Sequence, residues 1–147
     1  MSAWVGRYFK ASDVGCPCGC DFQEVHQGVV ELADAARESL GVPLDINSSV
    51  RCPEYNKEVG GRPASLHLPQ SDGLGYALDL TYYRDSDKGL LNMARLYIAL
   101  ESRARRFGVV GLGLYSWGCH VDLRGHTPNP RPAARWEEFP WPRIKRR

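Results

Sequence analysis

An aspartate in the middle of an apolar, strand-like stretch restricts the fold of this chain more than any other feature. Residues 76–83 alternate with the period of two that is typical of a β-strand, and Asp79 stands near the centre of the stretch. Burying a carboxylate there is costly unless the carboxylate is paired with a cation or bound to a metal ion. The fold must therefore bring partners for Asp79 from other parts of the chain.

Two long amphipathic segments predict helices that pack against this strand. Residues 23–40 place apolar side chains at helical spacing, and Gly41 then supplies a stop. Residues 87–107 form the second segment. Its expected buried side chains are Leu90, Leu91, Ala94, Tyr97, Ile98 and Leu100. A short third helix is expected over residues 53–59, because Pro53 suits the first turn of a helix.

Further strands are expected on both sides of the Asp79 stretch. They are residues 44–50, 109–115 and 119–124, with a turn at 116–118 between the last two. Because helices and strands do not alternate regularly, and the last two strands are neighbours, the pattern favours an α+β fold. We expect a mostly antiparallel sheet flanked by helices.

The length of 147 residues fits one small domain, 1–147, with irregular segments at both ends. Residues 1–22 are rich in cysteine and show no helical or strand period. Residues 125–147 are rich in proline and are expected to form an irregular arm, packed by Trp136, Phe139 and Trp141.

Four of the five cysteines lie in positions where they could act together. Cys16, Cys18 and Cys20 have one-residue spacing, unlike the two-residue spacing of common zinc knuckles. The odd count argues against a simple disulfide framework. Together with Cys52, these residues could bind a second, structural metal ion, form a disulfide, or merely pack as thiols. The sequence leaves these three alternatives open.

Two histidines and a second aspartate could join Asp79 in a metal centre. His67 lies in a loop before the Asp79 strand, and His120 and Asp122 share one face of a later strand. Two imidazoles and one carboxylate suit a catalytic zinc ion with an open fourth position, and Asp122 could then act as a general acid–base. Taken singly, a histidine is more often an ordinary surface or core residue than a ligand. Asp79 alone could cap a turn or pair with an arginine, and Asp122 alone could form a salt bridge with Arg124 or Arg51.

A series of short motifs runs along nearly the whole chain in a fixed order. The series is Gly15-Cys16-Pro17-Cys18-Gly19-Cys20, Ile46-Asn47-Ser48-Ser49-Val50-Arg51-Cys52-Pro53-Glu54-Tyr55-Asn56, Val59-Gly60-Gly61, Ser65-Leu66-His67, Gly75-Tyr76-Ala77-Leu78-Asp79, Gly111-Leu112-Gly113-Leu114-Tyr115, His120-Val121-Asp122-Leu123-Arg124 and Ala134-Arg135-Trp136. It resembles the zinc D-alanyl-D-alanine carboxypeptidase family, and in particular its short, phage-type peptidoglycan peptidase branch. The resemblance implies a hedgehog/DD-peptidase-like fold.

The resemblance also implies a role for individual residues. The implied zinc ligands are His67, Asp79 and His120. Arg51 is the implied catalytic and substrate-binding arginine, since its planar fork suits a substrate carboxylate or a developing oxyanion. Ser65 could orient a ligand or the substrate, or could simply cap its loop.

Two departures from the family pattern concern this site. Residues 68–74 make the spacing after the first histidine longer than is usual in the family, which predicts an expanded loop beside the metal ion. Trp117 stands where the family commonly has an acid, three residues before His120. The catalytic acid–base role is therefore expected to fall to Asp122.

The expected function is zinc-dependent hydrolysis of a peptide bond in bacterial peptidoglycan stem peptides or cross-links. The chain would then be a carboxypeptidase or an endopeptidase of a phage lysis or tail system. The alternative is a non-catalytic, zinc-stabilised module that binds the cell wall, because hedgehog-type domains resemble the same scaffold. The expected partner in both cases is peptidoglycan peptide.

Charge and hydropathy limit the other partners. A net charge of +2 with dispersed basic residues disfavours nucleic acid as a partner, and the basic run at 143–147 is expected to be a solvated terminus. The sequence shows neither the apolar core of a signal peptide nor an apolar run of ~20 residues, so we expect no membrane insertion. We expect a monomer made in the cytoplasm, reaching the wall after holin-type release or as a virion component.

Overall fold

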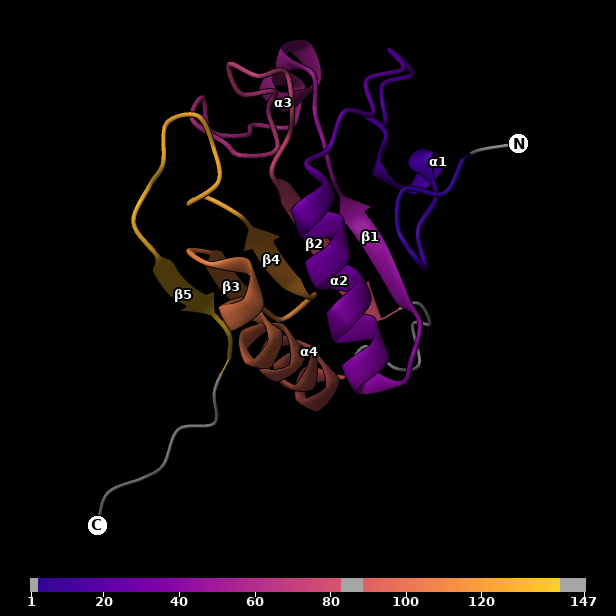
Figure 1. Cartoon of the computed structure of the whole chain (residues 1–147), viewed down its shortest axis with the longest axis vertical. Helices are drawn as coiled ribbons and strands as arrows, with labels where there is room; N and C mark the ends of the chain where they lie inside the picture. Colours follow the sequence, from indigo (N-terminus) through magenta and orange to yellow (C-terminus); the bar gives the residue numbers. More distant parts are fainter. Residues whose placement is uncertain (1–2, 83–88, 141–147) are drawn as a thin grey trace.

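Five strands form one mixed sheet in the computed structural model, which describes residues 3–82 and 89–140 (Figure 1). The strands are β1 (Leu44–Ser48), β2 (Ala77–Tyr82), β3 (Gly111–Tyr115), β4 (Cys119–Asp122) and β5 (Ala134–Glu138). Their order across the sheet is β1-β2-β4-β3-β5, with β3 and β5 parallel and the other three pairs antiparallel. The predicted α+β fold with a mostly antiparallel sheet is confirmed.

Two helices, α2 (Gln27–Leu40) and α4 (Leu90–Ala104), pack against each other and against the sheet (Figure 1). The part of the chain that the structure describes also contains three short elements: α1 (Ala11–Val14), α3 (Pro53–Glu58) and the 3₁₀ turn η2 (Arg105–Phe107). Within the described residues, no helix has both the length and the apolar character that crossing a membrane requires.

Helix α2 begins four residues later than the periodicity predicts. The imidazole of His26 accepts a hydrogen bond from the Gly28 N–H at 3.1 Å and so caps the helix. Val25 is drawn away from the helix into a bridge with Gly75. The predicted stop is confirmed, because Gly41 adopts a left-handed φ of 71° and closes the last turn.

The buried face of α4 differs from the predicted one. Leu91 and Ile98 are 66% and 65% exposed, although both were expected in the core. Leu90 is also 45% exposed, whereas Leu100 is buried as expected. The other residues that the helix buries are Met93, Leu96, Ala99 and Ala104. Apolar side chains occupy both faces of this helix, so the sequence pattern allows either face to be buried. Packing against the sheet and α2 determines which face is buried. The predicted start at residues 87–88 lies outside the described residues.

Strand alternation separates an apolar face of the sheet from a polar one. Leu78, Val121 and Leu112 lie side by side on β2, β4 and β3 and are fully buried. The adjacent row, on the opposite face, contains Asp79 and His120. The sheet therefore presents its chemically active side chains on the face away from the apolar core.

The C-terminal arm is not irregular throughout, contrary to expectation. Residues 134–138 form β5, an edge strand in parallel register with β3. The segment has no β-branched residue, so its own strand propensity is weak, and pairing with β3 decides its structure. Arg135 anchors it to α4 through an ion pair with Glu101 at 2.7 Å. Phe139 packs against the core, whereas Trp141 and the basic run at 143–147 lie outside the described residues.

The N-terminal segment also contains more regular structure than predicted. Residues 1–22 include the short helix α1 and an isolated bridge between Trp4 and Lys10. Val14 of α1 is fully buried, which ties this segment to the core.

Candidate metal centre

One row of residues crosses the polar face of the sheet and carries the candidate site. Ser48, Asp79, His120, Gly113 and Trp136 occupy matching positions on β1, β2, β4, β3 and β5. Asp79 and His120 are direct cross-strand partners, so strand register alone brings the carboxylate and the imidazole together. The Nδ1 atom of His120 lies 3.1 Å from Oδ1 of Asp79.

His67 reaches the same carboxylate from the loop before β2. Its Nε2 atom lies 3.3 Å from Oδ1 of Asp79, and its side chain is almost fully buried. Its Nδ1–H donates to the Ser49 carbonyl at 2.5 Å, because a carbonyl oxygen can only accept. The hydroxyl of Ser65 accepts a hydrogen bond from the His67 backbone N–H at 3.2 Å, so Ser65 shapes the loop that presents the ring.

The longer loop at 68–74 leaves His67 in place. It folds into a turn in which Gln70 and Leu74 are linked by a backbone hydrogen bond of 3.0 Å. The Asp72 carboxylate also accepts a hydrogen bond from the hydroxyl of Tyr76, the residue directly before β2. The insertion therefore closes on itself and does not displace the histidine.

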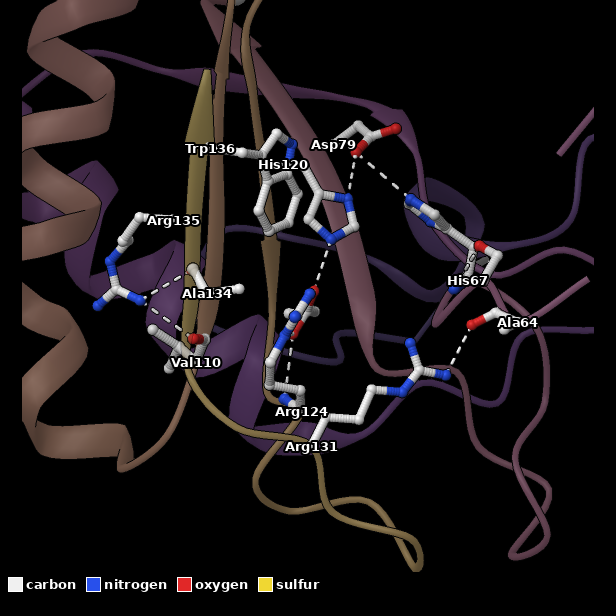
Figure 2. A network of polar contacts seen from close by, with 12 residues as sticks. Ala64, His67, Asp79, Val110, His120, Arg124, Arg131, Ala134, Arg135 and Trp136 are labelled. Carbon is white, nitrogen blue, oxygen red and sulfur yellow. Dashed lines mark hydrogen bonds and ion pairs between the residues drawn. The ribbon is translucent and has the colours of Figure 1, made fainter. Parts of the chain in front are cut away.

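Asp122 lies behind His120, on the side away from Asp79. Its Oδ2 atom accepts a hydrogen bond from Nε2–H of His120 at 2.7 Å, and the carboxylate is fully buried. Arg124 binds both oxygens of the same carboxylate, through Nε at 2.9 Å and Nη2 at 2.8 Å. Asp122 thus fixes the ring of His120. The Nδ1 atom of His120 is left directed at Asp79 (Figure 2).

These three residues fit a zinc ion. The candidate ligand atoms of His67, Asp79 and His120 all lie within 4.8 Å of one another. Each imidazole directs one nitrogen at Asp79 and gives its other nitrogen to a fixed acceptor, which is the arrangement typical of metal-binding histidines (Figure 2). Two imidazoles and one carboxylate also leave a position open for substrate or water. The structure therefore brings together the three predicted ligands.

The charges in the centre are strongly coupled. Burial would raise the pKa of Asp79, but hydrogen bonds with His120 and His67 outweigh it and hold the pKa well below its usual range. Burial would lower the pKa of His120, but hydrogen bonds to Asp122 and Asp79 raise it to about 9. Without a metal ion, His120 therefore carries a proton between two carboxylates near neutral pH.

We expect this proton to make zinc binding and stability depend on pH in opposite directions. A zinc ion must displace the proton from His120, so zinc affinity should rise about tenfold per pH unit between ~pH 6.5 and the pKa of about 9. The metal-free protein should lose stability over the same range. The raised pKa stabilises the fold fully below the unfolded value of ~6.5, and that contribution disappears as pH rises through the folded value.

Competition with a chromogenic chelator and thermal unfolding, each measured across this pH range, test the expectation. A zinc affinity that does not change with pH would contradict it. So would a metal-free protein whose unfolding midpoint rises between these two pH values.

Arg51, the arginine to which the resemblance assigns a substrate-binding role, lies at the edge of the centre. Its Nη2 atom is 3.9 Å from Oδ2 of Asp79, and its side chain is largely buried. Its Nε atom donates to the Ser48 hydroxyl at 3.1 Å, and Nη1 donates to Asn56 of α3 at 3.3 Å. The guanidinium is thus held in one orientation before any substrate binds.

An open cleft of about 660 Å³ lies over the metal centre. Arginines are prominent in its lining: Arg51, Arg62, Arg124 and Arg131. Arg131 also closes one end, because its Nη2 atom donates to the Ala64 carbonyl at 2.7 Å (Figure 2). Sequence reasoning selected only the first of these arginines, because Arg62 and Arg131 lie in irregular segments.

Apart from Trp117, sequence reasoning gave no site role to the aromatic and acidic residues on the β3–β5 side of the cleft. Tyr115, Trp117, Trp136 and Glu138 all line it. Trp117, at the position where the family commonly has an acid, stacks on Tyr115 with ring centroids 4.9 Å apart. Glu138 lies in the cleft wall because residues 134–138 form β5, a strand that the sequence did not predict.

Gly111 and Gly113 explain how two of these side chains reach the centre. A Cβ atom at Gly113 would collide with the Trp136 indole, and one at Gly111 would collide with the Arg124 guanidinium. Both side chains therefore lie flat over β3, and the Trp136 ring sits 5.3 Å from the ring of His120. The alternating glycines of this strand were the available signal for these two contacts.

The comparison with known families agrees with this geometry. A family model described as Peptidase M15 matches residues 8–122 of the 147. Comparisons with curated proteins and with solved structures give no significant match. The matched range includes Arg51 and the three residues of the metal centre, and it ends before β5. The resemblance to zinc D-alanyl-D-alanine carboxypeptidases is confirmed at the level of the family, which indicates metallopeptidase activity. The chain belongs to the Peptidase M15 family.

Proposed function

We propose that this metallopeptidase binds zinc through His67, Asp79 and His120 and hydrolyses peptide bonds in bacterial peptidoglycan. One observation carries the proposal: two fixed imidazoles converge on one largely buried carboxylate at the floor of an open, arginine-lined cleft. When bound, a zinc ion would act as a Lewis acid on the carbonyl of the scissile bond. The substrate is a stem peptide or a cross-link between stem peptides, and the setting is a phage lysis or tail system.

The arginines suit a substrate that carries carboxylates. Peptidoglycan stem peptides contain several carboxylate groups, and a planar guanidinium can bind a carboxylate through two parallel hydrogen bonds. Arg51 binds one such group next to the metal centre, because Ser48 and Asn56 already fix its orientation. Arg62 and Arg131 extend the positive charge along the cleft, where a longer peptide would lie.

The two remaining cleft carboxylates have different roles in this proposal. Asp122 was expected to transfer the proton, but its oxygens are occupied by His120 and Arg124, and its side chain is fully buried. These contacts support a positioning role, in which Asp122 orients the ring of His120. Glu138, at the cleft wall on β5, is then the candidate for proton transfer.

Digestion of purified peptidoglycan tests the function. The zinc-loaded monomer should generate new amine and carboxyl termini, detectable by mass spectrometry, and a chelator should abolish them until zinc is restored. Release of single amino acids would identify a carboxypeptidase, whereas opening of cross-linked dimers would identify an endopeptidase. If the zinc-loaded protein sediments with peptidoglycan but produces no new termini, the enzyme proposal fails and a non-catalytic binding module takes its place.

A further inference from the structure

Four thiols meet outside the metal centre, and the proposed function does not use them. Cys16, Cys18 and Cys20 of the N-terminal segment lie against Cys52, the residue before α3. Their four sulfur atoms all lie within 4.8 Å of one another, although the two segments are far apart in the sequence. The fifth cysteine, Cys119, is buried in β4 and stands apart from this group.

The sulfur positions match one face of a tetrahedron. The Sγ atom of Cys18 lies 3.5 Å from that of Cys16 and 3.6 Å from that of Cys52, and the Sγ atoms of Cys16 and Cys52 are 3.8 Å apart. A tetrahedral zinc ion with Zn–S bonds of about 2.3 Å holds its sulfur ligands about 3.8 Å apart. Cys20 lies close enough to supply the fourth corner. A disulfide would need a separation of about 2.0 Å, and all these cysteines are free in the structure.

The surrounding backbone is shaped to support thiolate ligands. The N–H of Cys52 donates to the sulfur of Cys16, and the N–H of Tyr55 donates to the sulfur of Cys52, both at 3.4 Å. Such donors stabilise the negative charge that sulfur carries as a metal ligand. Gly19 has a φ of 84°, a left-handed conformation that reverses the loop between Cys18 and Cys20. The reversal brings neighbouring thiols to one point.

Ordinary packing does not account for the group. Cys16 is buried, but Cys18 and Cys20 are exposed, and Cys52 is half-buried. Cysteines that only fill space lie in the interior. Here four thiols cluster although two of them are exposed to solvent. Four cysteine sulfurs can fill all four coordination positions of a zinc ion, which is typical of structural zinc sites.

We propose that Cys16, Cys18, Cys20 and Cys52 bind a structural zinc ion, distinct from the ion of the metal centre. The ion ties the N-terminal segment to the start of α3, and so to Arg51, the residue directly before Cys52. The Arg51 backbone N–H also donates to the His67 carbonyl at 2.8 Å. The thiolate site therefore braces the loop that presents Arg51 to the cleft. This last consequence rests on the proposed function, whereas zinc binding by the thiols does not.

Metal content and cobalt substitution of the full chain test the proposal. The purified protein should contain two zinc ions per chain, one for each group of ligands. Cobalt-loaded protein should show sulfur-to-cobalt charge-transfer absorption, which a site of two histidines and one aspartate does not produce. The double variant Cys18→Ser/Cys20→Ser should lose one ion and this absorption while keeping the other ion. Both positions are exposed, so the core stays intact.

Two further variants separate this proposal from the proposed function. His67→Ala should lose one ion but keep the sulfur-to-cobalt absorption. Cys119→Ala, the matched cysteine control, should keep both ions. Wild-type protein without sulfur-to-cobalt absorption would overturn the proposal, as would full zinc content in the double variant. So would an intact mass showing paired disulfides in protein purified under reducing conditions. None of these results would contradict the proposed zinc site of His67, Asp79 and His120.

Discussion

The His67→Ala variant is expected to lose zinc from the metal centre and to lose nearly all activity on peptidoglycan peptide. Removing this imidazole leaves Asp79 and His120, and two ligands hold zinc far more weakly than three. The ion would supply several kcal/mol of transition-state stabilisation, so kcat/KM should fall on the order of 1,000-fold or more. Metal analysis after dialysis should show one zinc ion fewer per chain than the parent protein.

The matched control is His126→Ala, another histidine-to-alanine change in a loop beside the sheet. His126 is exposed and its ring nitrogen bonds to the Phe107 carbonyl, away from the cleft residues. This variant should keep both its zinc content and its activity. If His67→Ala retained all of its zinc, His67 would be removed from the ligand set. If it lost zinc but kept full turnover, the proposed role of the metal ion in hydrolysis would fail.

The centre of the site was predictable because strand alternation determines it. Alternation within each strand could be read from the sequence, whereas the register that makes Asp79 and His120 direct partners on paired strands comes from the structure. The alternating glycines of β3 carried a similar signal. His67 and Arg51 lie in loops instead, and their assignment depended on the order of motifs along the chain, because loop geometry has no period that a sequence reveals.

The parts that sequence reasoning missed depend on tertiary packing. Helix α4 has apolar residues on both faces. The face with Leu96 packs against the sheet and α2, which leaves Ile98 on the exposed face. Strand β5 has weak propensity of its own and forms because β3 offers a free edge. Glu138 consequently entered the cleft without a signal in its own segment, and the only signal for Trp136 was the glycine that faces it on β3.

The Asp122→Asn variant is expected to be the most informative change behind the metal centre. The carboxylate of Asp122 accepts hydrogen bonds from the His120 imidazole and from the Arg124 guanidinium. The nitrogen atoms of these two partners that face it all act as donors. An amide has one accepting oxygen, so its NH₂ group must face one of the donors. The change also leaves Arg124 beside a neutral partner, and losing one member of a buried ion pair costs about 3–5 kcal/mol. We expect a clearly lower unfolding midpoint.

Catalysis by this variant separates positioning from proton transfer. If Asp122 orients His120, zinc affinity or turnover should fall about 10- to 100-fold, while the acidic limb of the pH–rate profile remains. If Asp122 is itself the base, that limb should disappear from Asp122→Asn. Glu138→Gln is the matched acid-to-amide change at the open wall of the cleft. It should keep both stability and zinc but lose the limb. A Glu138→Gln variant with unchanged kcat and pH profile would return the proton-transfer role to Asp122, since the cleft residues described here offer no other carboxylate outside the ligand set.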